Sequence, residues 1–158
     1  MLGLDTPKPG PGELEALFEQ LSPMPVTGQA WPRWVKVLTW AVVAIVGVQI
    51  LRVATGAQAA AVNPMVAGAV LVCFLGLLLV ARAMSTSQTT ISREGIEQSW
   101  ITRRRISWEE IQFAKFIPMI ASKRLVCFTR SGRPIVFQAG TPQLQAAFAR
   151  ISLLFRRR

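Results

Sequence analysis

The sequence predicts an α+β membrane protein, in which a transmembrane α-helical hairpin precedes a small antiparallel β-barrel or bent sheet closed by a C-terminal amphipathic helix. Composition supports this class, because 51% of the 158 residues are apolar and only 16% are charged, which is unusual for a soluble domain. Two long uncharged stretches lie in the middle of the chain. Short strand-like runs follow them, and an amphipathic stretch ends the chain.

The first segment, residues 1–33, is Pro-rich and is expected to contain a short amphipathic helix at 13–21. Helical spacing places four large apolar residues on one face of this helix. These residues are the candidate partner-docking set: Leu14, Leu17, Phe18 and Leu21. Because a helix of about two to three turns does not persist alone, it docks on the chain's own basic domain or on another protein, or it stays frayed.

Residues 34–82 are predicted to form two membrane-spanning helices, at 34–54 and 62–82. Each stretch has the ~20 mostly apolar residues that the hydrocarbon core requires, and the short connector makes the helices antiparallel, with membrane lipids around both. A buried hairpin in a soluble protein is the alternative, but so small a chain has too little other mass to bury it. Gln49 is the one strongly polar residue inside a span, and we expect it to make an interhelical hydrogen bond.

The distribution of lysine and arginine predicts how the hairpin is oriented. Only Arg52 lies beside the turn between the spans, whereas Arg33, Lys36 and Arg82 lie on the outer flanks, and the basic C-terminal segment follows. Because basic residues stay on the cytoplasmic side, we expect both the N- and the C-terminus in the cytoplasm and two spans in the cytoplasmic membrane.

Residues 86–158 are predicted to fold as a cytoplasmic domain of short antiparallel strands. Runs of apolar and β-branched residues between turn signals mark five or six strands, which would form a bent sheet or open barrel. Thr141 and Pro142 suit the start of a final helix that plugs one mouth of the barrel. Its apolar stripe consists of Leu144, Phe148, Ile151 and Phe155.

The excess of positive charge lies in the C-terminal half, where residues 83–158 contain thirteen Lys and Arg but four Glu. Near an anionic leaflet each basic side chain contributes about 1 kcal/mol, although solvated loops that only set the topology are the alternative. The candidate contacts to lipid or to an acidic partner are Arg103, Arg104, Arg105, Lys123, Arg124, Arg130 and Arg133. Nucleic acid is not expected, because no reading motif or aromatic platform can be placed.

Several kinds of catalytic chemistry are excluded by composition. The chain has no His and two Cys, so a His-based triad, a His-ligated zinc and a Cys-rich metal cage are excluded. Glu109 and Glu110 are adjacent, and adjacent side chains on a strand point in opposite directions. We therefore expect no catalytic residue, no metal and no cofactor.

Three segments of the C-terminal domain carry a resemblance to a known family: Thr90–Ile96, Arg105–Ile111 and the predicted hairpin Leu125–Phe137, followed by the final helix. Over residues 86–155 the chain resembles the bacterial pleckstrin-homology-like (PH-like) domains, which are often attached to one or two membrane helices. The resemblance implies a seven-stranded barrel capped by a helix, and a role in binding or scaffolding.

These observations favour a non-catalytic accessory, scaffolding or assembly subunit of an inner-membrane protein complex, whose partner is a larger integral membrane protein. The alternative is a membrane-surface module that binds anionic lipid headgroups through its basic loops. The accessory role ranks first, because a domain that is already tethered to the membrane needs no lipid affinity for recruitment and is well placed to bind a neighbouring protein.

Overall fold

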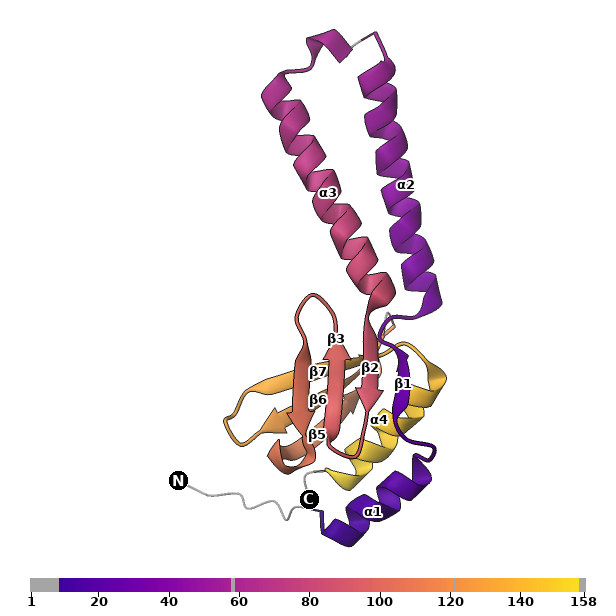
Figure 1. Cartoon of the computed structure of the whole chain (residues 1–158), viewed down its shortest axis with the longest axis vertical. Helices are drawn as coiled ribbons and strands as arrows, with labels where there is room; N and C mark the ends of the chain where they lie inside the picture. The colour runs from indigo at the N-terminus through magenta and orange to yellow at the C-terminus, as the bar shows by residue number, and fades with distance from the viewer. Residues whose placement is uncertain (1–8, 58, 121, 157–158) are drawn as a thin grey trace. The chain divides into compact units, whose positions relative to one another are not determined.

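The computed structural model describes residues 9–57, 59–120 and 122–156. The chain divides into two compact units (Figure 1). One unit is helical and comprises Arg33–Thr86, and the other combines Met1–Pro32 with Ser87–Arg158. The helical unit is therefore an insertion in a domain that is built from both ends of the chain.

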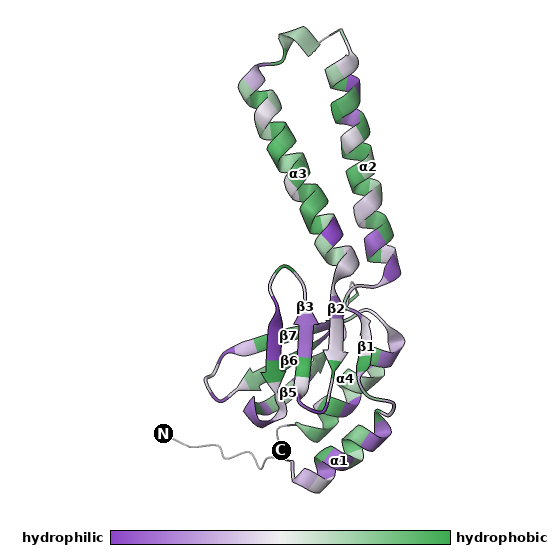
Figure 2. Cartoon of the chain, in the orientation of Figure 1, coloured by the Kyte–Doolittle hydropathy of each residue, from purple (hydrophilic) through white to green (hydrophobic). Residues whose placement is uncertain are grey.

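The helical unit is a hairpin of two 23-residue helices, α2 (Arg33–Thr55) and α3 (Pro64–Thr86), with a short 3₁₀ turn η1 (Ala59–Ala61) between them. At 1.5 Å per residue each helix is about 34 Å long, so both are long and apolar enough to cross a membrane. Only 6% of the most apolar window of each helix is buried, unlike the core helices of a soluble protein. Figure 2 shows that hydrophobic residues predominate on both helices.

Polar contacts join the two helices near the start of α2 and the end of α3, where the chain connects to β1 and β2. Lys36 Nζ donates a hydrogen bond to the Ser85 carbonyl oxygen at 3.0 Å, and Trp40 Nε1 donates to Ser85 Oγ at 3.0 Å. At the other end, Asn63 Oδ1 accepts a hydrogen bond from the Met65 amide at 2.8 Å, which caps the first turn of α3. The predicted hairpin is therefore present, with α3 extending four residues beyond 82.

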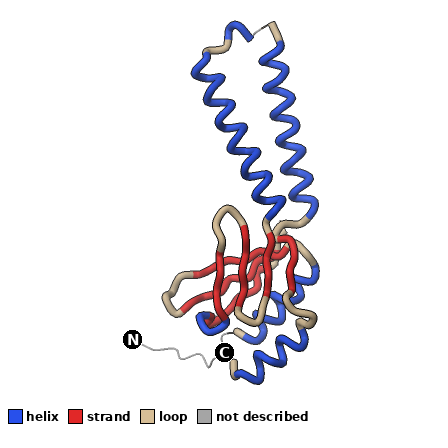
Figure 3. Tube along the Cα trace, in the orientation of Figure 1, coloured by secondary structure: helices blue, strands red, loops and turns tan. Residues whose placement is uncertain are grey.

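The described residues of the compact domain form seven strands in two antiparallel sheets (Figure 3). In the four-stranded sheet the order is β1 (Val26–Gln29), β2 (Gln88–Ile91), β3 (Gly95–Ser99), β4 (Arg104–Ser107). After the 3₁₀ turn η2 (Trp108–Glu110), the three-stranded sheet has the order β5 (Ile111–Ile117), β6 (Lys123–Thr129), β7 (Pro134–Ala139). The α+β class is confirmed, but the described strands form two sheets and no closed barrel, because β4 and β5 are not neighbours in one sheet.

The core of this domain lies between the two sheets and the C-terminal helix α4 (Pro142–Leu154). Leu144, Phe148 and Ile151 of α4 are fully buried, as their spacing along one helix face predicts. The indole of Trp108 stacks on the ring of Phe155 with centroids 6.1 Å apart. Burial of these apolar groups is the main force that holds the sheets and the helix together.

The N-terminal segment belongs to this domain, which differs from the division into consecutive segments 1–33, 34–82 and 86–158 expected from the sequence. Strand β1 pairs with β2 in antiparallel register, from Val26 opposite Ile91 to Gln29 opposite Gln88. Helix α1 (Pro11–Gln20) packs against α4 through the same core. Strand β1 was missed because its four residues contain a single large apolar side chain, and its partner lies some sixty residues away in the sequence.

A close approach between β1 and α4 depends on a glycine. A Cβ atom at Gly28 would overlap Thr141 Oγ1 and would lie 2.7 Å from Leu144 Cδ1. The absence of a side chain at Gly28 therefore lets the start of α4 lie directly on the strand. Gly140 fills a similar role beside Trp31, and its amide donates a hydrogen bond to the Gln29 carbonyl oxygen at 2.8 Å.

Candidate functional site

The seven predicted basic contact residues do not form one patch. Arg103 and Arg104 lie at the β3–β4 loop, and Lys123 and Arg124 begin β6. Both pairs of residues lie at the end of the domain that contains Gln29 and Gln88. We call this end the hairpin end, because the chain leaves the domain for α2 after β1 and returns from α3 into β2.

Strand register places the two loops at the hairpin end. Ser99, which precedes the β3–β4 loop, pairs with Gln88. Lys123, which follows the β5–β6 loop, pairs with Ala139 at the end of β7. The next residue, Gly140, donates a backbone hydrogen bond to the Gln29 carbonyl oxygen. The β3–β4 and β5–β6 loops therefore project from the same end of the domain as the two connections to the hairpin.

The remaining predicted basic residues lie elsewhere. Arg130 and Arg133 flank the β6–β7 turn, which is the opposite end of the three-stranded sheet. The Arg105 guanidinium forms an ion pair with Glu94, in the β2–β3 turn and away from the hairpin end. Of the seven residues, only Arg103, Arg104, Lys123 and Arg124 therefore lie at the hairpin end.

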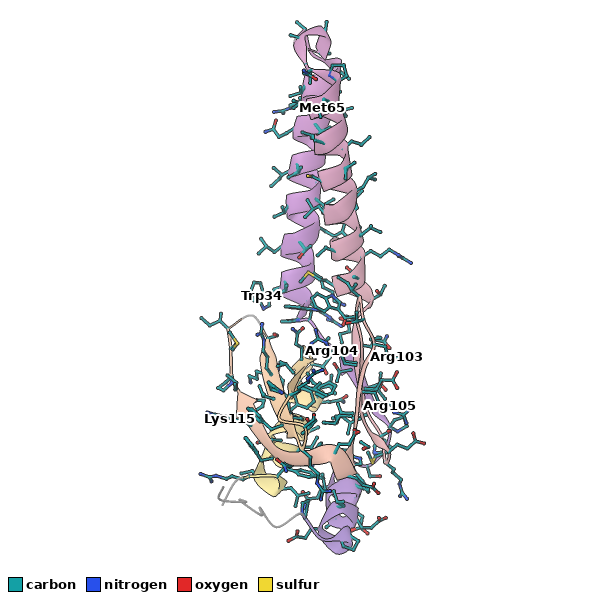
Figure 4. The ribbon with its side chains drawn as sticks, turned by 90° about the vertical axis from the view of Figure 1, so that its left-hand side faces the viewer. Trp34, Met65, Arg103, Arg104, Arg105 and Lys115 are labelled. Carbon is teal, nitrogen blue, oxygen red and sulfur yellow. The ribbon has the colours of Figure 1, made fainter. Side chains whose placement is uncertain are left out.

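Arg103 and Arg104 have different environments, although they are adjacent. Figure 4 shows Arg103 and Arg105 on the outer side of the sheet and Arg104 pointing inward. Arg104 Nη1 donates a hydrogen bond to the Val136 carbonyl oxygen at 3.2 Å, and its guanidinium lies 5.9 Å from the Trp100 ring centroid. Arg103 Nε lies 2.6 Å from a Glu97 carboxylate oxygen, but its side chain is 79% exposed. Such an exposed ion pair contributes at most about 1 kcal/mol, so Arg103 is available to an anionic ligand.

Sequence reasoning missed three exposed apolar side chains on these two loops. Ile101 in the β3–β4 loop is 65% exposed, and Met119 and Ile120 in the β5–β6 loop are 47% and 99% exposed. The signal was present in the sequence, because the apolar run Ile117-Pro-Met-Ile continues past the strand into a Pro-containing turn. Turns are normally polar, so an apolar turn indicates a surface that contacts something other than water.

The four predicted partner-docking residues of α1 contact the chain's own core. Leu17 and Leu21 are buried, and Leu14 and Phe18 pack against the core cluster. The Phe18 ring lies 5.8 Å from that of Trp108. Of the alternatives for this helix, the structure has the first, in which α1 docks on the chain's own basic domain.

The hairpin contains an apolar groove of about 640 Å³ between α2 and α3, toward the end distant from Ser85. Its lining comprises Gln49, Ile50, Val53, Ala54, Ala59, Val62, Val66, Ala67, Val70 and Leu71. Gln49 is exposed and makes no hydrogen bond to a residue that the structure describes, so the expected interhelical hydrogen bond is not found among the described residues. The two helices diverge here, which leaves the amide without a partner across the hairpin.

The two cysteines differ in accessibility. Cys127 on β6 is fully buried, and burial raises the pKa of its thiol to about 12, because the thiolate would be desolvated in the core. Cys73 on α3 is exposed on the helix surface. Cys127 is therefore a small core residue that reacts with a thiol reagent only when the domain opens.

Comparisons of the chain with protein-family models, with curated protein sequences and with solved structures gave no match. The features that bear on function are two loops with apolar tips and basic residues, and an apolar groove lined by the Gln49 amide.

Proposed function

We propose that this chain is a non-catalytic accessory, scaffolding or assembly subunit of a bacterial inner-membrane protein complex. In this proposal α2 and α3 cross the membrane, both chain termini are cytoplasmic, and the compact unit is a PH-like domain used for protein contacts. The partner is a larger integral membrane protein that contributes a transmembrane helix to the groove between α2 and α3. Arg33, Lys36 and Arg82 at the domain side of the hairpin support the orientation.

The strand order supports a PH-like domain. Seven antiparallel strands are divided four and three between two sheets, and one amphipathic helix follows the last strand. Six of these strands lie within residues 86–155, and β1 from the N-terminal segment brings the number to the seven that the resemblance implies, followed by a C-terminal helix. The fold class itself carries no activity, so the functional argument depends on the groove.

The observation that carries the proposal is the unpaired amide of Gln49 in the apolar groove. In hydrocarbon an amide without a hydrogen-bond partner costs several kcal/mol, and no described group of this chain satisfies it. Lipid tails offer no hydrogen bond, whereas a transmembrane helix of another protein offers both apolar surface and polar side chains. The groove and the amide together therefore favour a helix as the occupant.

The way in which the hairpin is inserted suits a scaffold. Two connections, one from β1 and one into β2, hold the domain, and Ala30 and Ser87 at their bases are buried and hydrogen-bonded to each other at 3.1 Å. Two covalent connections keep the domain within a shorter reach of the hairpin than a single long flexible linker would. Its local concentration near a membrane partner is correspondingly high.

Site-specific photocrosslinking in intact bacterial membranes tests the proposal. A photoreactive residue at Val53, which lines the groove, should crosslink to an integral membrane protein larger than this 17.4 kDa chain. Leu51 is the matched control, because it is exposed on the same helix but does not line the groove. Gln49→Leu should weaken the Val53 crosslink by about three- to thirtyfold, since interhelical hydrogen bonds contribute about 0.6–2 kcal/mol, whereas Gln49→Asn should retain part of it.

Two results would contradict the proposal. One is equal crosslinking from Val53 and Leu51, which would mean that the groove has no preferred occupant. The other is a Val53 crosslink only to lipid or to a second copy of the chain, which would replace the larger partner by a bilayer-facing groove or a homodimer.

A further inference from the structure

We propose that the β3–β4 and β5–β6 loops form a lipid-binding site, in which Ile101, Met119 and Ile120 enter the bilayer interface and neighbouring basic residues contact anionic headgroups. This inference goes beyond the proposed function, because it assigns a lipid ligand to the domain and not a protein ligand to the hairpin. It rests on α2 and α3 crossing the membrane, and on four observations about the compact domain.

The first observation is the short covalent connection between the hairpin end and the helices. Ala30 and Ser87 are hydrogen-bonded to each other, α2 begins at Arg33, and α3 ends at Thr86. Three residue steps from Ala30 to Arg33 span at most about 11 Å. Since the polar headgroup layer adds roughly 5–7 Å on each side of the hydrocarbon core, the hairpin end cannot move far from the bilayer surface.

The second observation is that the β3–β4 loop extends past β2, the strand that receives the chain from the hairpin. Ile101 lies two residues beyond Ser99, the partner of Gln88, which is about 7 Å further along the strand direction. The base of this loop is held by an aromatic contact, because the rings of Trp100 and Trp31 lie 6.4 Å apart, and by the contact of Arg104 with Trp100. The loop is therefore anchored at its base while Ile101 points into solvent in the absence of lipid.

The third observation is the combination of apolar tips with basic flanks. Ile120 is 99% exposed and Ile101 is 65% exposed, which is costly in water and favourable at a membrane interface. Arg103 flanks one tip, and Lys123 and Arg124 flank the other. Because each tip has a positive neighbour, lipid with an anionic headgroup is the ligand class that matches both properties.

The fourth observation is where the acidic residues lie. No Asp or Glu occurs between Gln98 and Trp108, and none follows Glu110, so neither loop contains a carboxylate. Glu94 is in the β2–β3 turn and Glu109 and Glu110 follow β4, all at the end of the four-stranded sheet opposite to Gln88. The α1 carboxylates precede β1, and Phe18 of that helix packs on Trp108. Glu97 of β3 is the exception, because its carboxylate forms an exposed ion pair with Arg103. The other described carboxylates of the domain lie away from the end that is tethered to the membrane.

The experiment uses the full chain in lipid nanodiscs made of equal parts phosphatidylcholine and phosphatidylglycerol. Cys73→Ala removes the exposed thiol, and Cys127 stays in place because it is buried and protonated. Single nitroxide labels are then introduced through Ile101→Cys, Ile120→Cys or Ser131→Cys, and electron paramagnetic resonance measures how far oxygen and a water-soluble nickel chelate reach each label.

Ser131 is the matched control, because its turn is exposed and lies between Arg130 and Arg133, but carries no large apolar side chain. We expect the labels at 101 and 120 to be at least twofold more accessible to oxygen than to the chelate, relative to the label at 131. In nanodiscs of phosphatidylcholine alone, this ratio should fall for both loops while the control stays unchanged.

Two outcomes would overturn the inference. If the labels at 101 and 120 have the same high chelate accessibility as the label at 131, the loops face water. If the loop labels are shielded from both oxygen and chelate, another copy of the chain covers them and lipid does not. Neither outcome bears on the Val53 crosslink, so the failure of the lipid site and the failure of the proposed function are distinguishable.

Discussion

Replacing Leu17 by alanine tests whether α1 is an integral part of the compact domain. Leu17 is 5% exposed and belongs to the core cluster that contains residues of both sheets and α4. Removing a buried leucine side chain down to alanine destabilises proteins by about 2–5 kcal/mol. Because Leu17 lies on a peripheral helix whose end can relax, we expect the lower part of this range, about 2–3 kcal/mol.

The loss of stability can be measured by the labelling of Cys127, since this residue is fully buried and its pKa is raised to about 12. In the Cys73→Ala background a thiol reagent labels Cys127 only in molecules whose domain has opened, so the labelling rate is proportional to the equilibrium constant for opening. A loss of about 2–3 kcal/mol therefore raises the labelling rate by about 30- to 150-fold. The measurement is made on the full chain in nanodiscs.

Leu153→Ala is the control for this prediction. Leu153 lies on α4 but is 68% exposed, and exposed substitutions usually change stability by less than about 0.5 kcal/mol. The labelling rate should then change by no more than about twofold. If the thiol reagent labels Cys127 at the same rate in the Leu17→Ala and Leu153→Ala variants, α1 does not stabilise the domain. The N-terminal contribution to the core would then be refuted.

Two further predictions use the same labelling or stability measurements. Gly28→Ala should destabilise the domain by about 1–3 kcal/mol, because the new methyl group overlaps the side chains of Thr141 and Leu144. The control is Gly12→Ala in α1, where nothing lies within 4 Å of an added methyl group, and this change should be neutral or slightly stabilising. Equal effects of the two changes would refute the close approach of β1 and α4. Because the pKa of Cys127 is raised from 9.0 to about 12, its contribution to stability is fully present below pH 9 and is lost as the pH rises toward 12, with a slope of about 1.4 kcal/mol per pH unit. Urea unfolding of Cys127→Ala should lack this alkaline slope, and an identical slope in the variant and in the parent chain would count against burial of the thiol in the native state.

Local patterns in the sequence were sufficient for much of this architecture. Length and uniform apolarity predicted the helices now seen as α2 and α3, and spacing predicted the buried face of α4 with Phe148 and Ile151. The strands after residue 86 were also found, because they are short runs with β-branched or apolar residues between turn residues. These features depend on neighbours within a few positions along the chain, and such information is contained in the sequence itself.

Only the tertiary structure decided how the ends of the chain combine and which loops share a surface. Strand β1 has little intrinsic preference for a strand, and it is stabilised by pairing with β2 and by the close fit of α4 at Gly28. That pairing turns the hairpin into an insertion and places Arg103, Lys123 and the exposed Ile120 at the tethered end, while Arg130 lies elsewhere. Register between strands distant in sequence depends on contacts that form only when the whole core is assembled, so composition and periodicity could not supply it.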